Sequence, residues 1–167
     1  MDLPKIPYIK SLDTFQTIKF YNSIKTGTTL ADQYLEYAKH SLVPVALEYI
    51  IGSDELGLAG RFDRLYWNIQ EQEYQIWDFK TDKKIDYTSS NKLKIFDLPD
   101  CAFSKYSLQT SLYKYIIESQ TNIKLGNSNI VWFDIKGNNW SIIPTTDYTE
   151  LIKQKSNEEY WRTYIPS

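Results

Sequence analysis

Two aspartates and a lysine near the middle of the chain have the types and spacing of a metal-dependent hydrolytic site. Asp63 lies in one apolar, alternating segment, and Asp78 and Lys80 lie in the next such segment. Two carboxylates can hold a divalent cation beside a phosphodiester, and a neighbouring lysine can orient the attacking water. The three residues therefore predict a metal-dependent nuclease site.

The elements that must position these groups are predicted to form a β-hairpin. Leu56–Trp67 and Tyr74–Lys80 are rich in aliphatic and aromatic residues and lack helical spacing, and the polar break Asn68–Gln72 separates them. Successive side chains of a strand point to opposite faces, so the acid and the lysine of the second strand share one face. Asp63 can face them across the hairpin. The register stays open, because a slip of one residue turns every side chain over.

The motif Asp-x-Lys is weak by itself, because it occurs three times in the chain. The occurrences are Asp78-Phe-Lys80, Asp82-Lys-Lys84 and Asp134-Ile-Lys136. Only the first follows a strand-borne aspartate at hairpin distance. The alternative interpretation of Asp78 and Lys80 is a surface ion pair, which contributes little to stability.

The wider pattern resembles a known family. Gly60-Arg61-Phe62-Asp63, followed by Ile76-Trp77-Asp78-Phe79-Lys80-Thr81, is similar to the core signature of PD-(D/E)XK nucleases, above all their RecB-like, phage-type exonuclease branch. Upstream, Val45-Ala46-Leu47-Glu48 resembles the strand that often supplies a further acidic ligand. Downstream, Gln109-Thr-Ser-Leu-Tyr113 matches the Gln-x-x-x-Tyr motif of this branch, whose two residues fall on one helical face. The resemblance covers residues 27–136.

The resemblance implies a mechanism and its cofactor. Mg²⁺ or Mn²⁺, which prefer oxygen ligands, would be bound by Asp63, Asp78, Glu48 and the backbone carbonyl of Phe79. Lys80 would orient the attacking water, while Gln109 and Tyr113 would contact the DNA backbone or Lys80. A 5′-phosphate product is implied by the resemblance alone.

Each accessory residue has a structural alternative. Glu48 can point outward from an apolar strand, Tyr113 can belong to the core, and Gln109 can lie on the helix surface. Candidate nucleic-acid contacts are Arg61, Arg64, Thr81, Lys83 and Lys84, and each of them can equally be a solvated or strand-ending residue.

Two departures from the family pattern concern metals. Many members carry a histidine at the start of the first core helix, where this chain has Ala31, and its only histidine, His40, comes nine residues later. A lone histidine there is more often a helix-end residue than a ligand. An iron–sulfur cluster needs four cysteines, and Cys101 is the only one, so a cluster is excluded.

Composition sets further bounds. The 167 residues are 42% hydrophobic with a net charge of −2, which is typical of a globular protein and argues against an extended duplex-binding surface. A single cysteine suits a reducing cytoplasm, where we expect the protein. No apolar run approaches the about 20 residues of a membrane helix, and neither a signal-peptide core nor a phosphate loop is present.

The predicted architecture is one α/β domain over residues 1–167. Its elements are helices over Leu12–Ile24, Thr28 to about His40, Ser104–Ser119 and Asp147–Tyr164, and strands over Pro44–Ile51, Leu56–Trp67, Tyr74–Lys80, Asn129–Ile135 and Trp140–Ile143. This order is the restriction-endonuclease-like αβββαβ core of the resembled family, with a central mixed sheet flanked by helices and a helix added at each end.

Three functions fit these observations. The first is a metal-dependent DNA nuclease, an exonuclease that acts at single- or double-stranded ends with a recombination or replication partner protein. The second is a catalytically silent nuclease-fold protein that binds DNA as an accessory in recombination or regulation. The third is an interaction protein whose hairpin is coincidental. Metal binding separates the first from the third, and no membrane association is expected.

Overall fold

The computed structural model describes most of the chain. It covers Lys19, Tyr21, Ile24, Leu56 and residues 28–54, 58–94 and 96–155, without the side chains of residues 47–51 and Leu58. The predicted helix over Leu12–Ile24 therefore falls almost entirely outside the described residues. The predicted C-terminal helix is described only as α4, Thr149–Gln154.

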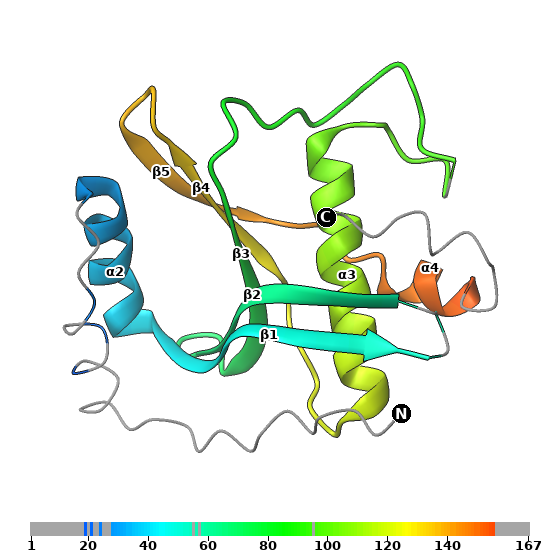
Figure 1. The fold of residues 1–167 in the computed structure, drawn as a ribbon, viewed down its shortest axis with the longest axis horizontal. Coiled ribbons are helices and arrows are strands. Elements are labelled where there is room, and N and C mark those ends of the chain that lie inside the picture. The colour runs from blue at the N-terminus through cyan, green and yellow to red at the C-terminus, as the bar shows by residue number, and fades with distance from the viewer. Residues whose placement is uncertain are drawn as a thin grey trace.

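Five strands form one mixed sheet in the order β1-β2-β3-β4-β5 (Figure 1). The strands are β1 Leu42–Ser53, β2 Leu58–Asn68, β3 Glu73–Lys80, β4 Asn129–Asp134 and β5 Asn139–Pro144. β3 pairs in parallel with β4, and the other neighbours are antiparallel. With α2 before β1 and α3 between β3 and β4, the structure confirms the predicted restriction-endonuclease-like α/β fold.

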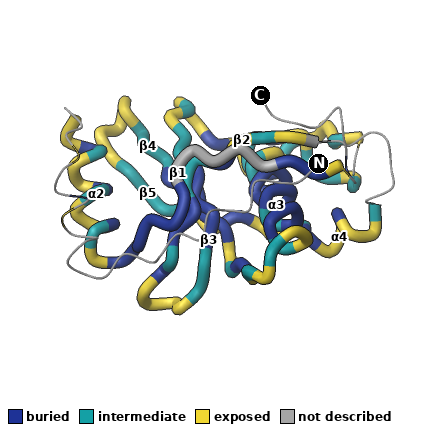
Figure 2. The backbone as a smooth tube through the Cα atoms, turned by 60° about the horizontal axis from the view of Figure 1, so that its bottom comes forward, coloured by how far each residue is buried: buried dark blue, intermediate teal, exposed yellow. Residues whose placement is uncertain are grey.

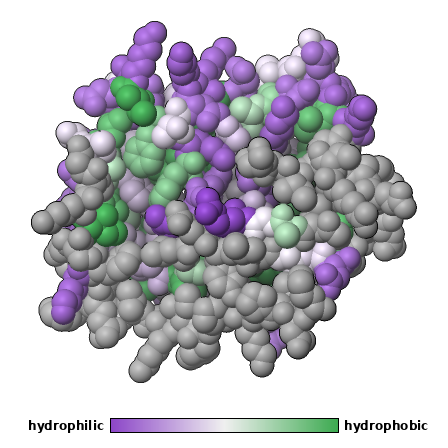
Figure 3. All heavy atoms as spheres, viewed as in Figure 1, coloured by the Kyte–Doolittle hydropathy of each residue, from purple (hydrophilic) through white to green (hydrophobic). Residues whose placement is uncertain are grey.

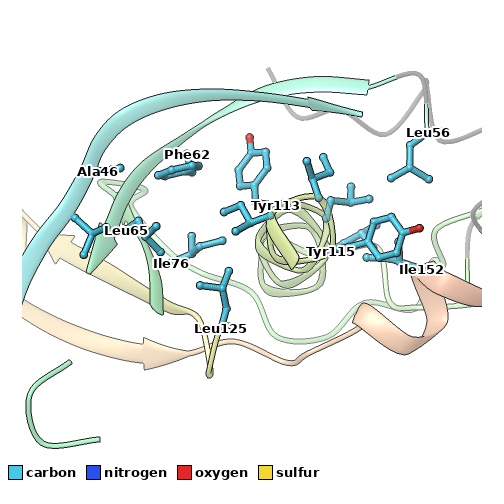
Figure 4. Close-up of a cluster of buried hydrophobic side chains, with 14 residues drawn as sticks. Ala46, Leu56, Phe62, Leu65, Ile76, Tyr113, Tyr115, Leu125 and Ile152 are labelled. Atoms are coloured by element: carbon cyan, nitrogen blue, oxygen red, sulfur yellow. The ribbon is translucent and has the colours of Figure 1, made fainter. Parts of the chain in front are cut away.

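The two main helices pack on opposite faces of β3, which is buried through its centre (Figure 2). On one face, α3 (Ala102–Gln120) closes a mainly aliphatic cluster that includes Leu65 and Ile76 (Figure 4). On the other, α2 (Thr29–Ser41) closes a largely aromatic cluster with Trp77. Alternating side chains of one strand supply both cores, so the strand that carries Asp78 is clamped between the two helices.

Local signals set most element boundaries, and the differences from prediction have simple causes. Thr28 caps α2 by accepting a hydrogen bond from the backbone of Ala31 at 3.3 Å. β1 starts at Leu42, before Pro44, because the register shift between Pro44 and Ala46 in this edge strand accommodates the proline. The helix predicted over Ser104–Ser119 begins earlier: its N-cap is Cys101, and Ser104 lies buried inside the helix.

None of the helices in the described part of the chain has the length and apolar character that a membrane span requires.

Candidate active site

The paired part of β2 and β3 ends where the candidate site begins. The last backbone partners are Arg64 and Trp77. One position further, Asp63 Oδ2 accepts a hydrogen bond from the backbone N–H of Phe79 at 2.9 Å, in place of a main-chain carbonyl. The Asp63 carboxylate thus continues the hydrogen bonding between β2 and β3, and the Phe79 N–H holds it beside Asp78.

Asp78 and Lys80 lie on one face of β3, as expected from their spacing. Lys80 Nζ lies 2.7 Å from Asp78 Oδ2. Apart from this ion pair, the buried oxygen has no hydrogen-bond partner. The pair is not a surface ion pair, because Asp78 is only 7% exposed.

The two carboxyl groups affect each other's protonation. Burial, and then the neighbouring Asp63, raise the pKa of Asp78 to about 7 against the effect of Lys80. Burial also acts to raise the pKa of Asp63, but hydrogen bonds from Asp78 and from the Phe79 N–H hold it below its usual value. Without a cation the two acids therefore share one proton near neutral pH.

Gln109 and Tyr113 of α3 also lie near the two aspartates. Gln109 Nε2 donates to the Tyr113 hydroxyl at 3.0 Å, and both side chains are buried. Figure 4 shows Tyr113 pointing from α3 toward the β1–β2 hairpin, where Gly60 admits its ring: a Cβ on Gly60 would lie 2.8 Å from Tyr113 Cε1. Burial raises the pKa of Tyr113, and the charges of the two aspartates add to the rise, so the phenol stays a proton donor.

The donor set fits a hard divalent cation. Within the described residues, the buried side-chain atoms that lack a hydrogen-bond partner are Asp78 Oδ2 and Gln109 Oε1. Both belong to the predicted site, and buried oxygens without partners normally indicate a water or an ion. The pKa of Asp78 is raised by burial and by the neighbouring Asp63. A bound cation would offset both effects, because it stabilises the ionised carboxylates.

A third acidic ligand is not among the described side chains. No group of three histidine, cysteine, aspartate or glutamate side chains converges among the residues that the structure describes. Glu48 belongs to β1, between Leu47 and Tyr49, which pair with Arg64 and Phe62. The backbone of Glu48 therefore runs beside that of Asp63. The Glu48 side chain is not among those that the structure describes.

Comparison with protein families agrees with this geometry. The family model of the PD-(D/E)XK nuclease superfamily matches residues 21–165. The chain belongs to the PD-(D/E)XK nuclease superfamily. Membership indicates a nuclease that acts on DNA, and superfamily members generally use divalent metals. No curated protein matches the chain.

In this PD-(D/E)XK protein, some predicted contacts lie away from the carboxylates. The guanidinium of Arg64 lies 5.1 Å from the centre of the Phe79 ring, on the α2 face, and Arg64 Nη1 donates to the backbone carbonyl of Asp63 at 2.8 Å. The structure thus places Arg64 behind the site. Arg61 and Thr81 are exposed. His40 lies at the end of α2, 3.7 Å from Glu36, as a surface residue.

The connection from β3 to α3 carries Lys83 and Lys84, two of the predicted nucleic-acid contacts. Hydrophilic side chains gather along the upper edge in Figure 3, where this connection runs in Figure 1. Two ion pairs join lysines of this connection to nearby aspartates, Lys84–Asp86 at 3.2 Å and Lys92–Asp97 at 3.1 Å. Lys105 of α3 forms a third pair with Asp100 of the connection at 3.0 Å. Much of the positive charge is therefore neutralised locally, and Lys83 and Lys84 stay exposed.

Two residues beside the site, Tyr106 and Asp82, were not predicted from the sequence. Lys80 Nζ lies 4.3 Å from the centre of the Tyr106 ring, and the Tyr106 hydroxyl donates to Asp82. Spacing alone could have indicated Tyr106, which precedes Gln109 by three residues and so lies on the same side of the helix. Fourteen tyrosines in the chain made that signal too weak to use.

Proposed function

We propose that this protein is a Mg²⁺- or Mn²⁺-dependent DNA exonuclease of the RecB-like type. One observation carries the proposal: at the end of the β2–β3 ladder, the half-buried carboxyl group of Asp63 lies beside the buried Asp78. Asp78 Oδ2 contacts the Lys80 ammonium and, apart from that ion pair, has no hydrogen-bond partner. Superfamily membership supports the reaction class. The ordered Gln109 and Tyr113 pair supports the exonuclease branch.

The residues divide the work between binding and orientation. Asp63, Asp78, the carbonyl of Phe79 and Glu48 would hold the cation, which when bound polarises the phosphodiester and acidifies water. The Phe79 N–H keeps Asp63 Oδ2 in place. Lys80 is fixed near Asp78 and there donates a hydrogen bond to the attacking water. Hydrolysis adds that water to phosphorus and breaks the bond to the 3′ oxygen, which leaves a 5′-phosphate.

The α3 residues act on the substrate side. The Tyr113 phenol keeps its proton because burial and the aspartate charges raise its pKa, so it can donate to a phosphate oxygen. The free Gln109 Oε1 can accept from the water that Lys80 orients. Arg61, Thr81, Lys83 and Lys84 are exposed positions for phosphate contacts along the strand. The net charge of −2 suits a protein that acts at DNA ends and takes further affinity from a partner protein.

The decisive experiment is cleavage of end-labelled linear single- and double-stranded DNA beside a closed circle. Each substrate is incubated with Mg²⁺, Mn²⁺ or EDTA, for wild type, Lys80→Ala and the matched control Lys153→Ala, whose lysine is an exposed residue of α4. We expect metal-dependent loss of linear DNA, a spared circle, a Lys80→Ala variant with only a small residual rate and an active control. Cleavage of the circle would change the assignment to endonuclease.

Absence of cleavage would point to the accessory-protein alternative. Titration calorimetry with Mn²⁺ then separates the possibilities, because a silent DNA-binding protein can keep the metal site while a coincidental hairpin has none. Binding in wild type that Asp78→Ala abolishes would support the site. A wild type that binds no Mn²⁺ would refute the proposed metal centre.

A further inference from the structure

The ammonium of Lys80 has two partners on two different elements. Asp78 of β3 supplies a carboxylate oxygen at 2.7 Å, and Tyr106 of α3 supplies the face of its ring at 4.3 Å from the ring centre. The lysine side chain is only 20% exposed. A cation held over an aromatic face in a partly desolvated place is attracted by the electron density of that face.

The ring of Tyr106 is itself held from two further elements. Its hydroxyl donates to the side chain of Asp82, just after β3. The indole N–H of Trp132 on β4 donates to the backbone carbonyl of the same aspartate at 2.7 Å. The sheet and α3 thus fix the ring through Asp82. A fixed ring is a better support for a flexible four-carbon side chain than a mobile one.

The second partner matters when the first is occupied. A divalent cation at Asp78 withdraws the carboxylate from Lys80 and repels the ammonium. Lysine has a long, rotamer-rich side chain, so without another contact it would move toward solvent. The Tyr106 ring lies on α3, attracts cations and carries no charge that a metal ion would compete for.

We propose that Tyr106 is a positioning residue, which keeps the Lys80 ammonium in the site when a metal ion occupies Asp78. The inference rests on the proposed nuclease function for its kinetic consequence. Its structural part concerns only the place of Lys80 in the metal-bound protein. Tyr106 acts through Lys80, and its aromatic face rather than its hydroxyl provides the support.

The kinetic test compares Tyr106→Leu with Tyr106→Phe, which keeps the ring. Tyr106→Leu is expected to lower kcat about tenfold while the KM for DNA stays unchanged. Tyr106→Phe keeps the ring but loses its bond to Asp82, so its kcat is expected to fall between those of wild type and Tyr106→Leu. Tyr37→Leu, on the outer side of α2 against Trp140, controls for loss of a partly exposed tyrosine. In a Lys80→Ala background, measured at the high enzyme concentration that reveals its residual rate, Tyr106→Leu should cause no further loss, because the two residues act as one unit.

A spectroscopic test does not depend on cleavage. The Lys80 side-chain CH₂ signal next to nitrogen, identified by its absence in Lys80→Ala, should be shifted upfield by the Tyr106 ring in Mg²⁺-saturated wild type. The shift should persist in Tyr106→Phe and vanish in Tyr106→Leu. Loss of the shift when Mg²⁺ binds would overturn the proposal, even if the enzyme is active.

The two proposals fail in different ways. A wild type that binds Mn²⁺ but cuts no DNA refutes the proposed function, while the shift still decides the placement of Lys80. An active wild type in which Tyr106→Leu costs as much with Lys80→Ala as without it refutes the role of Tyr106 alone. If Tyr106→Leu does not fold, the signal of wild type with and without Mg²⁺ still shows whether the ammonium stays over the ring.

Discussion

The two faces of β3 bury polar groups in different ways. On the α2 face the hydroxyl groups of Tyr34 and Tyr66 lie 2.7 Å apart, and Tyr21 donates to the Leu42 carbonyl at 2.9 Å. On the α3 face, Asp78 and Gln109 each bury an oxygen without a hydrogen bond. A satisfied buried network rigidifies a core, whereas unsatisfied oxygens cost stability.

We call the α2 side of β3, with Tyr34 and Tyr66, the aromatic face, and the α3 side, with Asp78 and Gln109, the acidic face. The first serves stability and the second serves the proposed function. The aromatic face contributes to the unfolding free energy and is complete without a ligand. The acidic face keeps a carboxyl with a raised pKa and an unpaired amide oxygen, an arrangement that folding alone does not favour. We expect a bound cation to stabilise this site, and each of the following changes tests the difference between the two faces.

The largest effect is expected for Asp78→Asn. We expect kcat to fall about 10³-fold or more, because a cation ligand is lost. The melting temperature of the metal-free protein at pH 8 should rise, because the amide needs no desolvation of charge and does not repel Asp63. DNA cleavage with metal measures kcat, and thermal unfolding in EDTA measures the melting temperature. A variant that is both inactive and less stable would contradict the comparison.

A smaller effect is expected where the acidic face meets the backbone of β2. The methyl group of Gly60→Ala would lie 2.8 Å from Tyr113 Cε1, so the ring must shift and its hydrogen bond from Gln109 is disturbed. We expect kcat to fall about tenfold and the unfolding free energy to fall by about 1–3 kcal/mol. Kinetics and urea unfolding provide both values.

Tyr113→Phe tests whether the glycine acts through the phenol. The double variant with Gly60→Ala should be no less active than the worse single variant, since both remove one hydroxyl contact. Additive losses of kcat would show that the glycine affects the site by another route.

The acidic face should also make the metal-free protein sensitive to pH. The folded pKa of Asp78 is about 7 against an ordinary value of 3.8, so the folded state binds more protons than the unfolded state between these values. The stabilisation from this proton is complete below the ordinary value and is lost as pH rises toward 7. The unfolding free energy in EDTA should therefore decline over this range in wild type relative to Asp78→Asn.

The lowered pKa of Asp63 acts in the opposite sense, since its contribution is lost as pH falls. Saturating Mg²⁺ should remove the decline caused by Asp78, because a cation favours the ionised form. Equal pH profiles for wild type and Asp78→Asn in EDTA would show that the shared proton is absent.

The smallest effect is expected on the aromatic face. Tyr34→Phe removes the hydroxyl pair with Tyr66 and should lower the unfolding free energy by about 1 kcal/mol. The kcat should stay unchanged, because the ring still packs against Phe79 and Trp140. Urea unfolding and cleavage rates measure the two quantities. A loss of kcat without a loss of stability would show that the aromatic face also contributes to catalysis, against this prediction.

Much of the fold was predictable because its signals are local. Alternation and the polar break predicted the β2–β3 hairpin, and the i, i+4 spacing placed Gln109 and Tyr113 on one side of α3. Register was not predictable, since it depends on which strand edges meet. The face of Arg64 was predictable, because Arg64 directly follows Asp63 on β2 and strand alternation places it on the opposite face.

Spacing along the chain determined that Asp78 and Lys80 share a face, because the strand period is a backbone property. Tertiary packing alone decided that Asp63 Oδ2 replaces a carbonyl for Phe79, that Asp78 is buried enough to hold a proton near pH 7, and that a tyrosine of α3 lies beneath Lys80. These properties arise where β2, β3 and α3 meet. No local pattern encodes them, because each depends on groups that are distant in sequence.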